Sequence, residues 1–309
     1  MTAPPVHLKV RLVGYGEVNR ILAEDLLARG VRDVAAFDIK LGGAAEAPLR
    51  DHARTHRVHL ATSHASLVAD ADLVISAVTA SQAVPVAEAC APAIRPGAWF
   101  LDFNSASPGA KRTAGGLIDA AGARYVEGAV MTSVPPYRIA TPLLLGGANA
   151  SGLLPLLDSL GFAAQVASDR LGVASATKMC RSVMIKGLEA MVIESFTAAR
   201  AYGVEREVLA SLAETFPGID WEKQGSYFFQ RVVQHGRRRA EEMREAAQTV
   251  REVGLEPWSA AGTAARQAWV ADLTDAGAMG SKDEARSDWR VDADRILKTL
   301  KPQPPKTED

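Results

Sequence analysis

Short apolar runs alternate with amphipathic stretches along the first half of the chain. The apolar runs predict strands at residues 8–13, 34–37, 73–78, 99–103, 125–129, 143–145 and 164–167, the first of them with the pattern of a buried parallel strand. The amphipathic stretches predict helices at residues 21–28, 84–94, 108–121 and 153–160, with a weaker helix and a short strand within 49–60. This alternation predicts an α/β fold with a doubly wound, mostly parallel sheet.

The pattern changes after one long helical stretch. Residues 168–203 contain no proline, open with the capping residues Ser168 and Asp169, and end at Gly203. Helical patterns follow at 205–214, 221–234, 237–253 and 259–273, without strand-like runs. We therefore expect a first domain at 1–167 and an all-helical domain at 168–300, with 168–203 as the connecting helix. The polar, proline-rich tail at 301–309 is expected to be disordered.

Composition narrows the class of protein. The chain has 309 residues, 48% of them hydrophobic, and a net charge of −1. A near-neutral charge argues against a nucleic-acid partner, which would require a basic face. No apolar run approaches the roughly 20 residues that span a bilayer, and no secretory signal opens the chain. We expect a cytoplasmic, enzyme-sized protein without a membrane partner.

A glycine loop follows the first predicted strand, with the sequence Gly14-Tyr15-Gly16-Glu17-Val18-Asn19. The first glycine permits a tight turn, and the second lets the backbone approach a pyrophosphate at the N-terminus of the next helix. The strand–loop–helix context favours a Rossmann-type dinucleotide site, although Asn19 replaces the third glycine. Asp38 closes the second strand, where a carboxylate binds adenosine ribose hydroxyls and repels a 2′-phosphate. NAD is favoured, and the nearby Lys40 leaves NADP open.

Two further groups of residues each have two interpretations, one as a solvent-exposed segment and one as a functional site. His52 and His56 could share a helical face as a metal pair, but Arg54 and Arg57 lie between and after them and favour an exposed segment, so we expect no metal site. In the long helix, spacings of three, four and eight residues place four polar side chains on one face. They are Lys178, Arg181, Ser182 and Lys186. This face is either a solvated basic stripe or a catalytic one.

With these features in place, the chain resembles the β-hydroxyacid dehydrogenase superfamily over about residues 8–200. The sequence Asp102-Phe103-Asn104-Ser105-Ala106-Ser107-Pro108 is similar to the family's D-x-S-T-x-x-P substrate segment. The sequence Glu127-Gly128-Ala129-Val130-Met131-Thr132-Ser133 is similar to D-A-P-V-S-G-G, without its two glycines. The stretch from Gly172 to Ser182 is similar to the catalytic helix motif G-x-x-G-x-x-x-K-x-x-x-N: Lys178 and Ser182 have its K-x-x-x-N spacing, with Ser182 at the asparagine position. The C-terminal sequence points to a subgroup with its own helical domain.

The resemblance implies a site at the carboxyl ends of the strands. Lys178 would be the general acid or base, with Ser182 beside it, and Ser105, Thr132 and Ser133 would bind substrate. We assign Val78, Thr79 and Asn104 to the cofactor site together with the glycine loop and Asp38.

The expected activity is NAD(P)-dependent hydride transfer to or from the carbinol carbon of a hydroxyacid-like substrate. A lysine needs a pKa below its usual value of about 10.4 to act as a base near neutral pH. Two alternatives stay open: an imine reductase or reductive aminase, whose known members generally lack the lysine, and a non-catalytic NAD(H)-binding protein. A homodimer through the helical domain is also expected.

Overall fold

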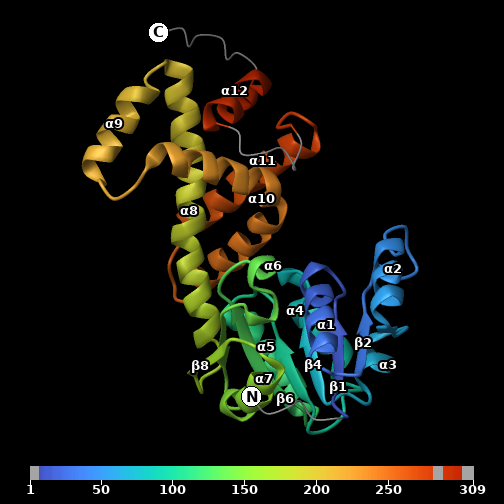
Figure 1. Cartoon of the computed structure of the whole chain (residues 1–309). Coiled ribbons are helices and arrows are strands. Elements are labelled where there is room, and N and C mark those ends of the chain that lie inside the picture. Colours follow the sequence, from blue (N-terminus) through green and yellow to red (C-terminus); the bar gives the residue numbers. More distant parts are fainter. Residues whose placement is uncertain (1–6, 281–287, 301–309) are drawn as a thin grey trace. The chain divides into compact units, whose positions relative to one another are not determined.

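The computed structural model describes residues 7–280 and 288–300 and divides the chain into two units (Figure 1). The first unit comprises Met1–Cys180 and Gln248–Leu255, and the second comprises Arg181–Ala247 and Glu256–Asp309. The units therefore divide inside the long helix α8 (Val173–Tyr202), whereas the sequence placed the division at Ser168. The tail predicted at 301–309 lies outside the described residues.

An eight-stranded sheet forms the centre of the first unit, in the order β3-β2-β1-β4-β5-β6-β7-β8. The strands are β1 (Lys9–Val13), β2 (Asp33–Phe37), β3 (His59–Leu60), β4 (Leu73–Ser76), β5 (Trp99–Asp102), β6 (Arg124–Val130), β7 (Leu143–Gly146) and β8 (Ala164–Ser168). The strands from β3 to β6 are parallel, β7 runs antiparallel to β6, and β8 is parallel to β7. This arrangement confirms the predicted doubly wound sheet. It brings the carboxyl ends of β1, β2, β4, β5 and β6 to one edge.

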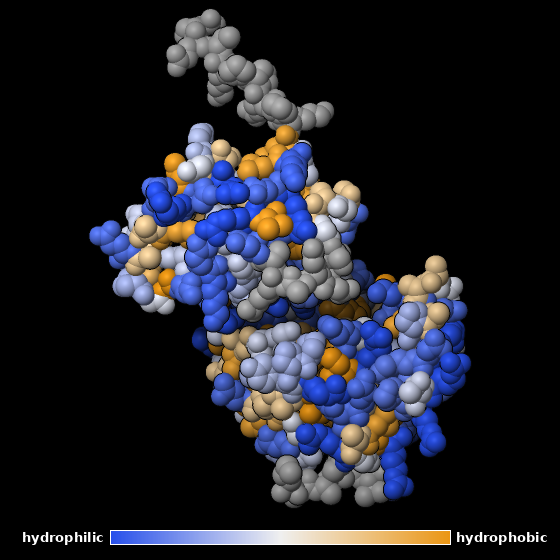
Figure 2. Space-filling model, turned by 45° about the horizontal axis from the view of Figure 1, so that its top comes forward, coloured by the Kyte–Doolittle hydropathy of each residue, from blue (hydrophilic) through white to orange (hydrophobic). Residues whose placement is uncertain are grey.

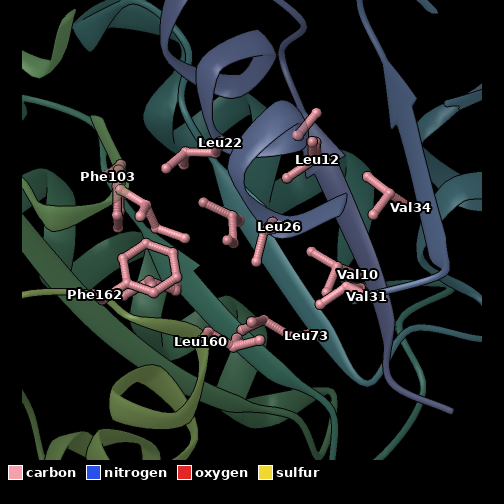
Figure 3. Packing of buried hydrophobic residues seen from close by; sticks show 14 of the residues in the cluster. Val10, Leu12, Leu22, Leu26, Val31, Val34, Leu73, Phe103, Leu160 and Phe162 are labelled. Carbon is pink, nitrogen blue, oxygen red and sulfur yellow. The ribbon is translucent and has the colours of Figure 1, made fainter. Parts of the chain in front are cut away.

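Helices cover both faces of this sheet. They are α1 (Glu17–Ala28), α2 (Ala47–His56), α3 (His64–Val68), α4 (Ala83–Cys90), α5 (Pro108–Ala120), α6 (Val134–Tyr137) and α7 (Ala150–Leu160). One apolar cluster joins α1, α2 and α7 to the sheet, and a second joins α3, α4 and α5 to the opposite face. Figure 3 shows the first cluster, in which Leu22 and Leu26 of α1 pack near Leu12 of β1. Strand residues alternate between the clusters, as the period of two requires.

The start of α8 differs from the sequence prediction. Ser168 is the last residue of β8, and the helix begins only at Val173. Gly172 intervenes with φ of 98°, a left-handed conformation that glycine adopts without steric cost. The predicted stop is confirmed, since Gly203 has φ of 70° and ends the helix.

The second unit contains helices joined by loops, with no strand among its described residues. Besides the rest of α8 it contains α9 (Glu205–Thr215), α10 (Trp221–Arg251, whose last residues belong to the first unit), α11 (Trp258–Asp275) and α12 (Trp289–Thr299). Its core includes Phe196, Phe229 and the fully buried Trp289. The sequence divided α10 into helices at 221–234 and 237–253 and did not predict α12. Gly236 lies inside α10 without breaking it. A Cβ there would lie 2.8 Å from the carbonyl oxygen of Gln267, so the glycine permits close packing against α11.

None of the helices within residues 7–280 and 288–300 is both long and apolar enough to cross a membrane. The face in Figure 2 is mostly hydrophilic, with apolar residues scattered between charged ones.

Candidate active site

The glycine loop connects β1 to α1 at the carboxyl edge of the sheet. Gly14 has φ of 78°, and a Cβ there would lie 2.6 Å from Val78 Cγ1 and 2.7 Å from the carbonyl oxygen of Ala77. Only glycine fits that position. Gly16 precedes the first turn of α1, and a Cβ there would meet nothing within 4 Å. The space beside Gly16 and the free amides of the helix N-terminus together fit a pyrophosphate.

Asn19 occupies the position of the missing third glycine and is fully buried. Its Nδ2 atom donates to the carbonyl oxygens of Val13 at 3.0 Å and Gly14 at 2.6 Å. The side chain therefore links α1 to the end of β1 by hydrogen bonds. Asn19 at the third glycine position thus stabilises the glycine loop.

Asp38 is tied directly to the glycine loop. Its Oδ2 atom accepts the backbone N–H of Tyr15 at 2.7 Å, and its Oδ1 atom accepts the N–H of Lys40 at 2.9 Å. The side chain is buried at the end of β2, while Lys40 is exposed. These bonds hold the carboxylate beside the loop, in the place where a ribose-binding acid is required.

Asn104 joins the ends of β4 and β5. Its Oδ1 atom accepts the N–H of Val78 at 2.7 Å, and its Nδ2 atom donates to Ser76 Oγ at 3.0 Å. Its own N–H donates to Asp102 Oδ1 at 2.8 Å. Asn104 thus holds the backbone of Val78, whose side chain lies close to Gly14, and it belongs to the substrate-like segment, directly before Ser105.

Lys178 reaches that segment from α8. Its Nζ atom donates to Ser105 Oγ at 2.6 Å, across 73 residues of sequence. Both side chains are half-buried, so they combine fixed geometry with access to solvent. Two residues that the sequence singled out separately are therefore brought together at the carboxyl edge of the sheet.

Glu127 sets the position of α8. This fully buried carboxylate on β6 accepts the N–H groups of Gly172 at 3.0 Å and Ala174 at 2.9 Å, and Ser175 Oγ at 3.1 Å. It satisfies helix N-terminal amides and opposes the positive end of the helix dipole. The expected caps, Ser168 and Asp169, lie four and three residues before Gly172, too early for this role.

An ion pair and two hydrogen bonds support the segment after β5. Lys111 of α5 is buried and pairs with Asp102 Oδ1 at 2.9 Å, and Tyr125 donates to Asp102 Oδ2 at 2.6 Å. Burial, followed by the charge of Asp102, holds the pKa of Tyr125 well above its usual value, which keeps this donor protonated. Glu252, in the returning stretch Gln248–Leu255, accepts the N–H of Gly109 in the first turn of α5 at 2.9 Å.

The other expected site residues occupy less constrained positions. Glu17 and Val18 lie in the first turn of α1, exposed and half-buried respectively, and Thr79 is exposed after β4. Thr132 is exposed after β6, and Ser133 precedes α6. Ser182 belongs to the second unit, where it is buried and accepts Lys186 Nζ at 3.3 Å. Its pairing with Lys178 stays a prediction.

Sequence reasoning did not assign a role to Glu127, Lys111 or Glu252. An isolated carboxylate in the apolar strand around Glu127 was a usable signal, because such a group is buried only with partners. Lys111 lies in an ordinary amphipathic helix, and Glu252 acts on α5 across 143 residues of sequence, so neither carries a local signal.

Comparisons with known proteins place the chain in a family. The model for a domain of unknown function, DUF1932, matches residues 199–270. The structure of a conserved hypothetical protein from Sinorhizobium meliloti 1021 is 34% identical, with a TM-score of 0.75 over 95% of this chain and 98% of that one. The conserved protein MTH1747, described as structurally similar to 3-hydroxyacid dehydrogenases, is 30% identical, with a TM-score of 0.67 over 86% of this chain and 99% of that one.

A more distant structure shares the fold. The 3-hydroxyisobutyrate dehydrogenase of Mycobacterium tuberculosis, solved with L-serine, is 19% identical, with a TM-score of 0.65 over 94% of this chain and 99% of that one. The glycine loop, the strand-end Asp38 and the Lys178 helix stand in the order that the resemblance predicted. The chain therefore belongs to the β-hydroxyacid dehydrogenase superfamily, in the group whose helical C-terminal part carries the DUF1932 domain.

Proposed function

We propose that the protein is an NAD(P)-dependent oxidoreductase acting on the CH–OH or C=O carbon of a hydroxyacid-like substrate. The observation that carries the proposal is the 2.6 Å contact between Lys178 Nζ and Ser105 Oγ at the carboxyl edge of the sheet. Ligands of open α/β sheets bind at this edge. The family assignment supports the same class of reaction.

The residues around Gly14 and Gly16 fit a nicotinamide dinucleotide. The pyrophosphate would lie against Gly16 and the first turn of α1, and the adenosine ribose would lie against Asp38. The side chain of Val78 lies beside Gly14. When bound, the nicotinamide ring supplies or accepts the hydride. The carboxylate of Asp38 favours NAD over NADP, because a 2′-phosphate beside it would meet like charge.

Lys178 is the proposed proton-transfer group. In the oxidising direction its neutral amine accepts the proton of the substrate hydroxyl, and in the reducing direction its ammonium donates a proton to the developing alkoxide. Ser105 holds Nζ in place and offers its own hydroxyl as a hydrogen-bond partner for the substrate oxygen. Thr132 and Ser133 follow β6 at the same edge and are proposed to orient the rest of the substrate.

The supporting contacts reduce the freedom of this pair. Glu127 fixes the first turn of α8 and therefore the position of Lys178, one turn further along the helix. Asn104 and the buried Asp102–Lys111 pair fix the backbone that carries Ser105. Preorganisation of this kind lets a proton be transferred without a costly rearrangement.

The experiment compares Lys178→Met with Arg181→Ala, an exposed position on the same helix. We expect Lys178→Met to lower kcat for the best substrate of a hydroxyacid panel by about 10²–10⁴-fold while NADH affinity stays within a factor of about three. Arg181→Ala should retain activity. Full turnover by Lys178→Met would refute the role of the lysine.

The substrate panel also separates the alternatives. Cyclic imines and ketone–amine mixtures test for an imine reductase or reductive aminase, and turnover of these in preference to hydroxyacids would overturn the proposed substrate class. NADH binding without turnover of any substrate in either panel would instead favour a non-catalytic NAD(H)-binding protein.

A further inference from the structure

Three side chains away from the contact between Lys178 and Ser105 have the chemistry of a metal site. Glu24 of α1 and His52 and His56 of α2 each present one ligand atom, and these atoms all lie within 4.8 Å of one another. All three side chains are half-buried, and His52 and His56 are one helical turn apart with stacked rings. We propose that Glu24, His52 and His56 bind a divalent transition metal of the Zn²⁺ class.

The donor set suits that class of ion. Two imidazoles and one carboxylate, with a water in the fourth position, are a common tetrahedral set for zinc. His52 Nε2 and Glu24 Oε1 are 3.0 Å apart. Two ligands at bond lengths of 2.0–2.1 Å on a tetrahedral ion are about 3.3 Å apart, so this pair has to open by only a few tenths of an ångström.

The groups behind these ligands are arranged as a metal site requires. Tyr15 Oη lies 2.8 Å from His52 Nδ1, so that an Nδ1–H tautomer donates to the phenol oxygen and leaves Nε2 for the metal. Arg138 binds only the second oxygen of Glu24, at 2.6 Å, and directs its Nε–H to Asp25. The carboxylate is thereby oriented to bind through Oε1 alone.

The cations that argued against a metal in the sequence do not face this cluster. Arg54 is two residues from both histidines, which places it on the opposite side of α2, and it is exposed and pairs with Asp51 at 2.8 Å. Arg57 follows the end of the helix in a left-handed conformation and is exposed. The local sequence could not show this, because it does not reveal which side of α2 faces α1.

The position of the site suggests its effect. A metal would join α2 to α1 and hold His52 against Tyr15, whose backbone N–H is bound by Asp38. Occupancy would therefore stabilise the glycine loop and the end of β2 without contacting the reacting atoms.

The test uses the full chain, free of any histidine tag and stripped with a chelator. Zn²⁺ is titrated by calorimetry, and Co²⁺ by its visible absorption, at pH 7.5. We expect one equivalent to bind to the wild type, and at least tenfold weaker binding to His56→Ala. His59→Ala, an exposed histidine on β3, should match the wild type. Binding should be lost at pH 5, because both imidazoles must be deprotonated to ligate.

Thermal unfolding provides a second measurement. Added Zn²⁺ should raise the Tm of the wild type and of His59→Ala but not that of His56→Ala, and the metal-free Tm of the two variants should stay near that of the wild type, which shows that they are folded. Equal Zn²⁺ affinity in the wild type and His56→Ala, or no binding to the wild type at 100 μM Zn²⁺, on the order of a weak protein site, would overturn the proposal.

Discussion

The cap that Glu127 forms on α8 yields a quantitative prediction. Glu127→Gln keeps the shape of the side chain and one oxygen for the N–H groups of Gly172 and Ala174, but it removes the charge. Its amide would face Ser175 Oγ, which already donates to the Gly172 carbonyl in an alternative bond and is able to accept. The substitution therefore isolates the electrostatic part of the cap.

The magnitude follows from the contacts. Charge-assisted hydrogen bonds are roughly twice as strong as neutral ones, so two weakened bonds cost about 1–2 kcal/mol. Loss of the charge–dipole interaction adds about 0.5–1 kcal/mol, and the lower desolvation cost of the neutral amide offsets part of the sum. We expect a net loss of about 2 kcal/mol. Glu127→Ala should cost about 4 kcal/mol, because it also leaves buried amides without an acceptor.

Hydrogen exchange is the suitable assay, since two units need not unfold in one transition. A local loss of about 2 kcal/mol should accelerate exchange of the amides at residues 172–178 by about 30-fold. Glu194→Gln, a largely exposed residue of α8 that pairs with Arg266, is the control and should change exchange little. Unchanged protection of residues 172–178 in Glu127→Gln would show that the carboxylate charge does not hold the helix start.

Three further predictions concern cofactor choice, pH and assembly. Asp38→Asn should weaken NADH binding by about tenfold and NADPH binding less, as measured by fluorescence titration. The amide oxygen still accepts the Tyr15 N–H, but the neutral side chain no longer repels a 2′-phosphate. An unchanged ratio of the NADH and NADPH dissociation constants would contradict this. Burial first, and then cations such as Arg238, lower the pKa of His235 to about 4. The unfolded ring binds its proton below about 6.5, so unfolding free energy should fall as pH decreases from 6.5 to 4. The full pKa shift of His235 corresponds to about 3 kcal/mol of unfolding free energy, and solvent screening of a half-exposed ring reduces this to about 1 kcal/mol. Urea melts should show this decrease in unfolding free energy between pH 6.5 and 4 in the wild type and not in His235→Gln. We propose a homodimer through the helical unit because Met191 is 59% exposed on α8, so Met191→Lys should convert the dimer to a monomer in light scattering, and a monomeric wild type would refute it.

The sequence by itself determined the sheet, the order of its strands and helices, and the identity of the dinucleotide loop. These features depend on local patterns: apolar runs that must be buried, glycine where φ is positive, and a carboxylate that closes β2 at Asp38. Lys178 and Ser105 were each assigned from the resemblance, whereas their contact across 73 residues of sequence is seen only in the structure.

Only the tertiary structure decided how these parts are held. α8 begins at Val173 and not at the predicted Ser168, because its cap comes from Glu127, 45 residues earlier than Gly172, and not from a neighbour in sequence. The faces of α2 were likewise assigned by packing, which turned His52 and His56 toward Glu24 and left Arg54 in solvent. Local pattern fixes which residues must be buried, whereas the partner of a buried polar group is chosen by contacts between distant segments, and these carry no periodic signal in the chain.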